Sequence, residues 1–587
     1  MKGHSPVWMV YRRPLRSLDG TVRRWERFSP SDSDAVELIH SSGGKEDVIV
    51  QFGRYTVNVH NRWMHAYYWR ENKWPIVRGT WFWRESTEGI ICPFGEADAE
   101  TIEEAYLDIS SGKEEGPIDC ELVDTDIVAG TVQFVREVTK PPESDKSDPS
   151  SSATSSADPV APVPKIVITF ALYRLLDPSN PTNSRTERLE VFRGYPHEWE
   201  PTSEEQLSQH VSHLVFAVHG IGEALYNRQN DPQMGSMRFR GNCDLVRENL
   251  NTKLVENTIK KTPSIAPPGR VEVLPVEWSE SIHSNFLDRR LEAVTLPNLA
   301  GVRDFANLAL TDVFLYTQSD IQGRILAHIQ QRINALSDKF IARRPNSDNT
   351  HQITVSFIGH SLGGVVLYDL LRSTSLNDLK FKPSAVFFMG CPLAMFLTIR
   401  DPFKAVEEAG GSAIQLPIHP NCRLFNIFHP YDAIAYRLEP LVDLRMKQNE
   451  PCLVPYKGGH RVHVAIRKSV ATVLSSIGEW FSSNSPPPVI TIPGKQLVQH
   501  QVVSGGPAGP LTTDDRDEIK RIKKLNFNER IDWILQETAV ESVSEWVSAV
   551  GGHFTYWRNE DVYNFIIGQL IGIEKIRHKG NEFFISP

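Results

Sequence analysis

The chain has 587 residues, of which 40% are hydrophobic and 23% are charged, so it can bury a large core and is not disordered throughout. Its 63 basic and 72 acidic residues give a net charge of −9 without a long Lys/Arg block, which argues against general nucleic-acid binding. The six cysteines form no CxxC pair, which disfavours a zinc ribbon or a dense disulfide framework and indicates a reduced, cytoplasmic protein. The N-terminus lacks the apolar core of a secretory signal.

Residues 1–138 are predicted to form a separate N-terminal α+β module. Its large aromatic residues are interleaved with arginines: Trp25, Tyr55, Trp69, Trp81 and Trp83 with Arg24, Arg54 and Arg78. This pattern fits either a recognition surface for a protein partner or phosphorylated ligand, or a small core of packed aromatics, and the core is favoured. Residues 139–165 are rich in Ser, Pro and Asp, which predicts a disordered linker.

Residues 166–580 are predicted to form one large unit in which short apolar strands alternate with helices. The sequence predicts strands at 214–218, 271–278, 353–359, 385–390 and 423–428, and helices at 243–261, 319–340, 531–536 and 561–576. This alternation predicts a doubly wound, mostly parallel sheet of the α/β class. Residues 482–510, rich in Pro and Gly, are expected to be a disordered insertion. The most apolar long stretch, 298–316, holds three charged residues, too many for a membrane span.

The most specific motif is G-H-S-L-G at 359–363, which matches G-x-S-x-G. A predicted strand precedes it and a helix-like segment follows it, so the motif predicts a strand–turn–helix elbow of the α/β-hydrolase type. In such an elbow the serine occupies a strained turn that exposes its hydroxyl near a helix N-terminus. Ser361 is therefore the predicted nucleophile of an acyl transfer.

Acyl transfer also needs hydrogen-bond donors for the developing oxyanion. The predicted strand at 214–218 continues into an HGIG sequence, and such a glycine-rich loop can aim main-chain N–H groups at that charge. We expect the amides of Gly220, Ile221 and Gly222, together with that of Leu362, to form the oxyanion hole.

The acid and the base of this fold follow the serine in the order Asp or Glu, then His. Asp432 follows the strand at 423–428 and a proline, whereas Asp401 and Asp443 follow no comparable strand. Asp432 is therefore the favoured acid. The alternative is an aspartate that only stabilises the turn in which it lies.

Five histidines lie beyond Asp432: His460, His463, His500, His553 and His578. The first two lie in a strand-like pattern, the third in the expected insertion and the last in a charged stretch near the chain end. His553 follows two glycines and precedes the aromatic sequence FTYW. It thus combines loop freedom with a bulky anchor, as a general base requires, and it is the favoured base.

With these residues placed, the chain resembles the intracellular phosphatidic-acid-preferring phospholipase A1 family, the DDHD-domain proteins. The matching segments are VHGIG (218–222), VEVLPVEW (271–278), DVFLYTQ (312–318), IGHSLGG (358–364), FNIFHPYDAIAYRLEPL (425–441), RIDWILQE (530–537) and GHFTYWRNED (552–561). The resemblance maps the lipase serine to Ser361, the four residues that name the domain to Asp432, Asp532, His553 and Asp561, and the DDHD region to about 384–577. The segments RRWERFSPSDSDAVEL (23–38) and VQFGRYTVNVH (50–60) resemble the WWE-like region of the family.

The resemblance implies a phospholipase A1 that hydrolyses the sn-1 acyl ester of phosphatidic acid and related membrane glycerophospholipids through Ser, Asp and His, without a cofactor. Asp532 and Asp561 then support the triad by orienting the His553 loop, and a metal site built from the quartet is the alternative. It also implies a cytoplasmic protein that associates peripherally with organelle membranes of the ER/Golgi type. A catalytically silent lipid-binding trafficking protein, and an acylglycerol lipase or acyltransferase with the same triad, are the competing functions.

A basic cluster precedes Asp532 and fits either local steering of an anionic headgroup or a solvated helix face. Its members are Lys520, Arg521, Lys523, Lys524 and Arg530.

Overall fold

The computed structural model of the chain describes residues 6–11, 25–71, 73–84, 89–111, 113, 118–122, 128–139, 165–175, 186–220, 239–261, 267–278, 290, 293–294, 312–344, 353–373, 379–400, 414, 416, 418–455, 513–536, 553 and 555–578. The chain divides into two compact units, Met1–Pro201 and Thr202–Pro587.

The first sheet of the N-terminal unit has six strands in the order β2-β1-β6-β5-β4-β3, and its paired strands run antiparallel. The strands are β1 (Val7–Tyr11), β2 (Trp25–Arg27), β3 (Asp47–Val50), β4 (Tyr55–Asn58), β5 (Trp63–Ala66) and β6 (Trp74–Gly79). Helix α1 (Pro30–Ser41) begins after Ser29, whose hydroxyl accepts a hydrogen bond from the Asp32 amide at 3.1 Å. Serine before proline is a preferred helix start.

The second sheet of this unit has six strands in the order β8-β7-β12-β11-β10-β9. They are β7 (Trp81–Arg84), β8 (Ile91–Pro93), β9 (Ile118–Leu122), β10 (Val128–Thr139), β11 (Lys165–Leu175) and β12 (Thr186–Arg193). Strands β10 and β11 pair antiparallel from Gly130↔Arg174 to Thr139↔Lys165. Apart from its two ends, the Ser/Pro segment expected as a linker lies outside the described residues.

This pairing changes the domain boundary that the sequence predicts. Since residues 139 and 165 are partners in one antiparallel ladder, the Ser/Pro segment joins two strands of the same sheet instead of two domains. The N-terminal unit extends to Pro201, and the second unit begins at Thr202, not at residue 166. Composition alone identifies a poorly packed segment but cannot tell whether the strands on either side of it pair with each other.

One core is shared by the two N-terminal sheets and helix α2 (Glu96–Ser111). It contains residues from β1, β2, β7, β8 and α2, among them three of the predicted aromatics, Trp25, Trp81 and Trp83. Tyr55 and Trp69 are also buried, and their rings meet edge to face with centroids 5.7 Å apart. The five aromatics therefore pack inside the unit, as the favoured alternative predicts. Of the three arginines, Arg54 is buried and Arg78 pairs with Glu37 at 2.8 Å, while Arg24 lies outside the described residues.

The second unit is built on a seven-stranded sheet in the order β14-β13-β15-β16-β17-β19-β18, and its paired strands run parallel. The strands are β13 (Ser208–Val218), β14 (Gly269–Val276), β15 (Thr354–His360), β16 (Ala385–Met389), β17 (Arg423–Phe428), β18 (Cys452–Leu453) and β19 (Asp532–Ile534). The predicted parallel α/β sheet is confirmed. The chain runs from β13 to β14 on one side and returns to β15 on the other, so the strand order reverses at β13. In open parallel sheets, ligands bind at the carboxyl ends of the strands beside such a reversal.

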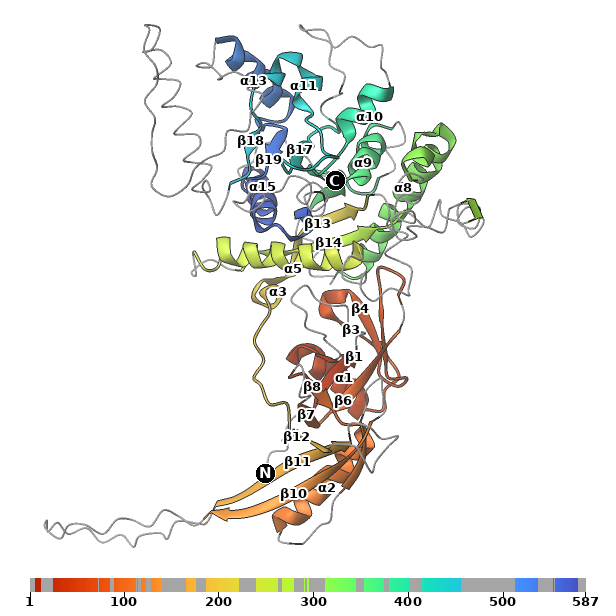
Figure 1. Cartoon of the computed structure of the whole chain (residues 1–587), viewed down its shortest axis with the longest axis vertical. Helices are drawn as coiled ribbons and strands as arrows, with labels where there is room; N and C mark the ends of the chain where they lie inside the picture. The colour runs from red at the N-terminus through yellow and green to blue at the C-terminus, as the bar shows by residue number, and fades with distance from the viewer. Residues whose placement is uncertain are drawn as a thin grey trace, which may run out of the picture. The chain divides into compact units, whose positions relative to one another are not determined.

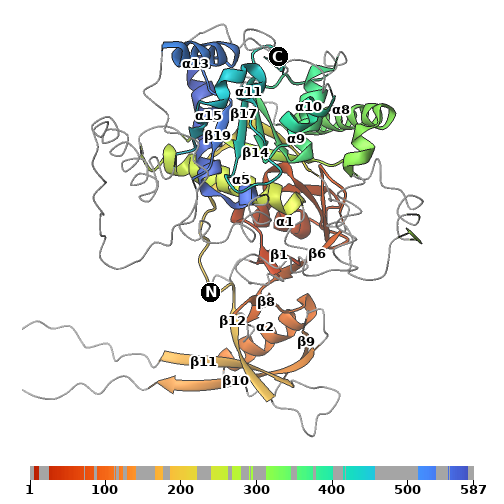
Figure 2. The same cartoon turned by 45° about the horizontal axis from the view of Figure 1, so that its top comes forward.

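Helices cover both faces of this sheet (Figures 1 and 2). Phe387 and Met389 of β16 join the core that contains α5 (Phe239–Asn257) and α15 (Glu560–His578). Phe388, between them, lies against Gly364 of α9 (Leu362–Arg372). Because successive side chains of a strand point to opposite faces, α9 lies on the face opposite to α5 and α15.

The remaining described helices are shorter or peripheral. They are α3 (Ser203–Gln206), α8 (Ser319–Ala342), α10 (Leu393–Arg400), α11 (Glu439–Val442) and α13 (Thr513–Leu525), with 3-10 turns η1 (Gln51–Gly53), η6 (Leu444–Lys447) and η8 (Thr555–Arg558). Among the described helices, none is long and apolar enough to cross a membrane.

One expectation for the C-terminal region is wrong. Residues 531–536 are predicted as helix, but 532–534 form β19, which pairs in parallel with β17 and β18. A six-residue apolar segment has no clear period of its own, and the open edge of β17 decides its conformation. The basic cluster is also divided, because Arg530 is buried against Glu439 and Arg521 pairs with Asp443 at 3.3 Å.

Candidate active site

Ser361 lies between the end of β15 and the start of α9, at the carboxyl edge of the sheet. Its backbone has φ 54° and ψ −127°, a region that non-glycine residues occupy only when the surrounding structure enforces it. Its amide donates to the carbonyl of Met389 in the neighbouring strand at 2.9 Å. This is the strained strand–turn–helix geometry that the G-x-S-x-G motif predicts.

The glycines of the motif allow helix α9 to approach the strands closely. A Cβ atom on Gly359 would lie 2.7 Å from Cα of Gly364, and one on Gly363 would clash with the carbonyl oxygens of Val218 and His219. Any larger residue would force the helix away from β13 and β15. Leu362 is the first residue of α9, where main-chain N–H groups have no partner within the helix.

Gly220, at the carboxyl end of β13, lies directly against the serine. A Cβ atom on Gly220 would be 2.6 Å from Cβ and 3.3 Å from Oγ of Ser361. The preceding His219 fixes this turn, since its Nε2 accepts from the Trp278 amide at 3.0 Å and its ring stacks on the Trp278 indole. The other two expected oxyanion residues, Ile221 and Gly222, lie outside the described residues.

Asp432 and His553 form a buried pair at the same edge of the sheet. Asp432 lies in the loop after β17, and His553 lies shortly before η8. Nδ1 of His553 is 3.0 Å from both carboxylate oxygens of Asp432. Burial alone would raise the pKa of the Asp432 carboxyl, but hydrogen bonds from His553, Tyr556 and the Ile434 amide, with the charge of His553, bring it below its usual value. The carboxyl is thus held as an anion beside the imidazole.

The serine turn and the histidine segment are joined by His360, the residue before Ser361. Nε2 of His360 donates to the main-chain carbonyl of His553 at 2.8 Å, and the two ring centroids are 4.9 Å apart. Burial, with the nearby His553, lowers the pKa of His360 to about 3, so the ring is neutral at physiological pH. Hydrogen bonds therefore connect the segments that carry Ser361, Asp432 and His553, which lie far apart in the sequence.

The alternative acids and bases are not part of this group as far as the structure describes them. Asp443 pairs with Arg445 at 2.9 Å and with Arg521, and its hydrogen bond from Arg445 lowers the pKa of its carboxyl. His578 is the last residue of α15. The alternatives outside the described residues are Asp401, His460, His463 and His500.

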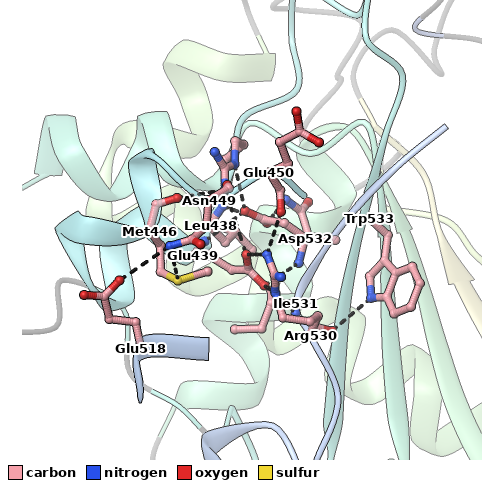
Figure 3. A network of polar contacts seen from close by, with 12 residues as sticks. Leu438, Glu439, Met446, Asn449, Glu450, Glu518, Arg530, Ile531, Asp532 and Trp533 are labelled. Atoms are coloured by element: carbon pink, nitrogen blue, oxygen red, sulfur yellow. Dashed lines mark hydrogen bonds and ion pairs between the residues drawn. The ribbon is translucent and has the colours of Figure 1, made fainter. Parts of the chain in front are cut away.

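Asp532 occupies a different buried network, at the start of β19 (Figure 3). Its carboxylate accepts from the amides of Leu438 at 2.9 Å and Glu439 at 3.1 Å, and from the side-chain amide of Asn426 at 2.9 Å. Burial and the negative charge of Glu439 raise the pKa of Asp532 to about 6. Asp532 thus braces the end of the loop that carries Asp432, rather than the His553 loop that it is expected to support.

Glu439 completes this network and is not predicted from the sequence. Its carboxylate accepts from Arg530 Nε at 2.7 Å and from the amides of Ile531 at 3.0 Å and Asp532 at 3.2 Å. It therefore ties β19 to the segment that follows Asp432 (Figure 3).

The fourth residue of the quartet, Asp561, lies in the first turn of α15. Asn559 caps this helix, because its side-chain oxygen accepts from the amides of Asp561 at 2.9 Å and Val562 at 3.2 Å. Of these four residues, Asp432 and His553 form the buried pair, Asp532 holds the end of the loop after Asp432, and Asp561 lies at the start of α15. Within the described parts of the chain, no three His, Cys, Asp or Glu residues are grouped as metal ligands.

Two residues that contact the pair, His360 and Tyr556, are not identified from the sequence. The Tyr556 hydroxyl donates to Oδ2 of Asp432 at 2.6 Å. A signal for Tyr556 was present, because it lies three residues after His553 in the aromatic FTYW sequence. Its hydrogen bond crosses 124 residues of sequence, so only the folded chain shows its partner.

The chain matches a known domain family and several known proteins. The model of the DDHD domain matches residues 379–487 and 508–571. The chain is 23% identical to triacylglycerol hydrolase DDHD2 of Homo sapiens, over 96% of this chain and 92% of the relative. It is 22% identical to SEC23-interacting protein of Homo sapiens, over 93% and 70%. It is 25% identical to a probable mitochondrial phospholipase of Schizosaccharomyces pombe, over 93% and 84%. No solved structure matches the chain.

Proposed function

Since this chain is a DDHD-domain protein, we propose that it is a serine lipid hydrolase with an α/β-hydrolase fold. Ser361 is the nucleophile, His553 the general base and Asp432 the acid. The observation that carries the proposal is the buried Asp432–His553 pair, joined through His360 to a serine in a strained turn. A strained serine beside a histidine–carboxylate pair is the arrangement that activates a hydroxyl for acyl transfer.

In the proposed mechanism, His553 takes the proton of Ser361 while Asp432 orients the imidazole and stabilises its charged form. The serine oxygen attacks the ester carbonyl, and the amides of Gly220, Ile221, Gly222 and Leu362 stabilise the oxyanion. His553 then gives the proton to the departing alcohol. Water activated by His553 attacks the acyl-enzyme and releases the fatty acid.

The proposed substrate is a membrane glycerophospholipid, cleaved at the sn-1 ester, with phosphatidic acid as the preferred headgroup class. The resemblance to phospholipases A1 supports this choice, as does the relative named a probable phospholipase. A second candidate substrate is triacylglycerol, because the chain is also similar over 96% of its length to a relative named a triacylglycerol hydrolase.

We further propose peripheral association with organelle membranes of the ER/Golgi type. The relative named SEC23-interacting protein supports a protein partner and this location, whereas the relative named as mitochondrial points to a second organelle. A catalytically silent trafficking protein is the competing function. The enzyme is favoured because Asp432 is hydrogen-bonded to His553, and the residue before Ser361 is hydrogen-bonded to the main chain of His553.

The decisive experiment compares fatty-acid release by the wild type and by Ser361→Ala. The substrates are vesicles of phosphatidic acid, vesicles of phosphatidylcholine and an emulsion of triacylglycerol. Ser373→Ala is the matched control, because Ser373 lies at the other end of α9 and its hydroxyl donates to the carbonyl of Leu370 in the same helix. We expect loss of release in Ser361→Ala alone. Undiminished release by Ser361→Ala would overturn the proposal, and transfer of the acyl group to added glycerol would identify an acyltransferase.

A further inference from the structure

The hydroxyl of Tyr556 is the third group on the carboxylate of Asp432. It donates to Oδ2 at 2.6 Å and accepts from the main-chain amide of His429 at 2.8 Å. Since the amide can only donate, the phenol hydrogen points to the carboxylate. The side chain of Tyr556 is fully buried, so no water competes for either bond.

The donors around Asp432 leave its carboxylate one orientation. Oδ1 accepts from the Ile434 amide at 2.8 Å, Oδ2 accepts from Tyr556, and His553 approaches both oxygens at 3.0 Å. The Ile434 amide belongs to the acid's own loop, whereas Tyr556 comes from the segment that carries His553. Among these bonds, those from His553 and Tyr556 join the segment of the acid to the segment of the base. Without Tyr556, the imidazole contact would be the one that remains of them.

Gly390 provides the space for this contact. It has φ 61°, and a Cβ atom there would lie 2.7 Å from Oδ2 of Asp432 and 2.7 Å from a ring carbon of Tyr556. The residue that follows strand β16 therefore lets the phenol and the carboxylate meet at hydrogen-bonding distance.

We propose that Tyr556 is a positioning residue for the reaction, which fixes the Asp432 carboxylate in the orientation that receives His553. This inference rests on the proposed function. Tyr556 touches neither substrate nor nucleophile and acts through Asp432. Because it lies three residues after His553, one short segment delivers both the base and the group that holds its acid.

The test is Tyr556→Phe, which keeps the ring and removes the hydroxyl. Tyr563→Phe is the matched control, because Tyr563 is also buried and its hydroxyl donates to the carbonyl of Trp557 in the same region, away from Asp432. The first measurement is the rate at which an alkyl fluorophosphonate labels the full-length protein, as a function of pH. This probe reports the reactivity of an activated serine without a choice of lipid. The second is kcat and KM on the lipid that the wild type hydrolyses.

We expect Tyr556→Phe to lower the labelling rate and kcat by about 10- to 100-fold, as for a lost hydrogen bond to a charged group, with KM nearly unchanged. The acid limb of the labelling rate should move to higher pH, because a carboxylate that loses a neutral donor holds the protonated base more strongly. Tyr563→Phe should keep the wild-type limb and rate.

A purely structural role would reduce the folded fraction, seen in the thermal midpoint, and leave the pH limb and the rate per folded molecule as in Tyr563→Phe. That result would overturn the inference. The proposed function fails separately, if labelling of the wild type does not depend on Ser361. A wild type that is labelled at Ser361, together with a Tyr556→Phe variant that matches its control, contradicts the role of Tyr556 alone.

Discussion

The imidazole of His360 donates a hydrogen bond to the main-chain carbonyl of His553 at 2.8 Å, across 193 residues of sequence. Both rings are buried. The residue before the candidate nucleophile therefore anchors the segment that carries the candidate base. This contact fixes the distance between the serine turn and the His553 segment. It does so through the backbone of His553 and does not occupy the imidazole of His553.

Replacing His360 should reveal this anchor. We expect His360→Phe to lower kcat by about tenfold or more, because it leaves the buried carbonyl of His553 without its donor. His360→Gln places an amide N–H near the position of Nε2 and should retain much more activity. The measurement is fatty-acid release with the substrate of the wild type. Equal activity of the two variants would show that the hydrogen bond does not position the base.

The same residue predicts how stability depends on pH. The pKa of His360 is about 3 in the folded chain and about 6.5 in an unfolded one. Between these values the unfolded chain binds more protons, so the free energy of unfolding falls as the pH falls, by about 1.4 kcal/mol per pH unit for one such group. Asp532 has the opposite sign, because its pKa is raised to about 6, and it favours the folded state as the pH falls through that value. Urea unfolding between pH 4 and 7 should therefore show a weaker loss of stability on acidification in His360→Gln than in the wild type; parallel curves would contradict the assignment.

Gly390→Ala should disrupt the acid–base pair. The positive φ disfavours alanine, and the added Cβ atom would lie 2.7 Å from Oδ2 of Asp432 and 3.2 Å from Nδ1 of His553. We expect a loss of activity of about 100-fold or more, since misplacing a reacting group by about 1 Å is costly. Gly323→Ala is the control, because nothing lies within 4 Å of a Cβ atom there and alanine favours the interior of α8. Activity in Gly390→Ala close to that of the control would mean that the pair tolerates displacement.

Asp532→Ala should destabilise the second unit rather than abolish the chemistry directly. It would remove the acceptor of the buried amides of Leu438 and Glu439 and one of the two acceptors of the Asn426 side-chain amide, which keeps its bond to the carbonyl of Tyr436. We expect a loss of about 2–4 kcal/mol in the free energy of unfolding, and, on the proposed role of Asp432, a smaller reduction of the rate per folded molecule than in Asp432→Ala. Asp517→Ala, at an exposed pair with Lys520, is the control and should leave the unfolding midpoint unchanged. A normal unfolding midpoint with full loss of activity would instead give Asp532 a direct role.

The local features of the chain were predictable because they depend on neighbours in sequence. The strands at 214–218 and 423–428 lie within β13 and β17, and the strand at 353–359 matches β15 with a shift of one residue, since short apolar runs between turn residues admit few other conformations. The serine turn was predictable for the same reason, as Gly359 has its close neighbours at Gly363 and Gly364. The approach of Gly363 to Val218 and His219 at the end of β13 was not predictable in this way, because it joins residues far apart in the sequence.

The strand at Asp532 and the hairpin across the Ser/Pro segment were not predictable, because both depend on pairing with distant residues. Residues 532–534 are extended because they pair with β17 and β18, and residues 165–175 join the N-terminal unit through their ladders with β10 and β12. In both cases hydrogen bonds to a distant segment decide the conformation, and the composition of a segment does not indicate which segment it pairs with.

The composition and net charge of the chain argued against general nucleic-acid binding. The G-x-S-x-G motif, followed in order by an acid and a histidine, predicted acyl transfer. The sequence by itself thus determined the serine turn and predicted the reactive side chains, because residue types and local turns are encoded within a few residues. Only the tertiary structure decided which groups hold them: Tyr556 on the carboxylate of Asp432, His360 on the carbonyl of His553, and Asp532 on the end of the loop that carries Asp432. The physical reason is that a buried hydrogen bond needs a partner at about 3 Å, and folding, not sequence distance, sets which residues meet at that separation.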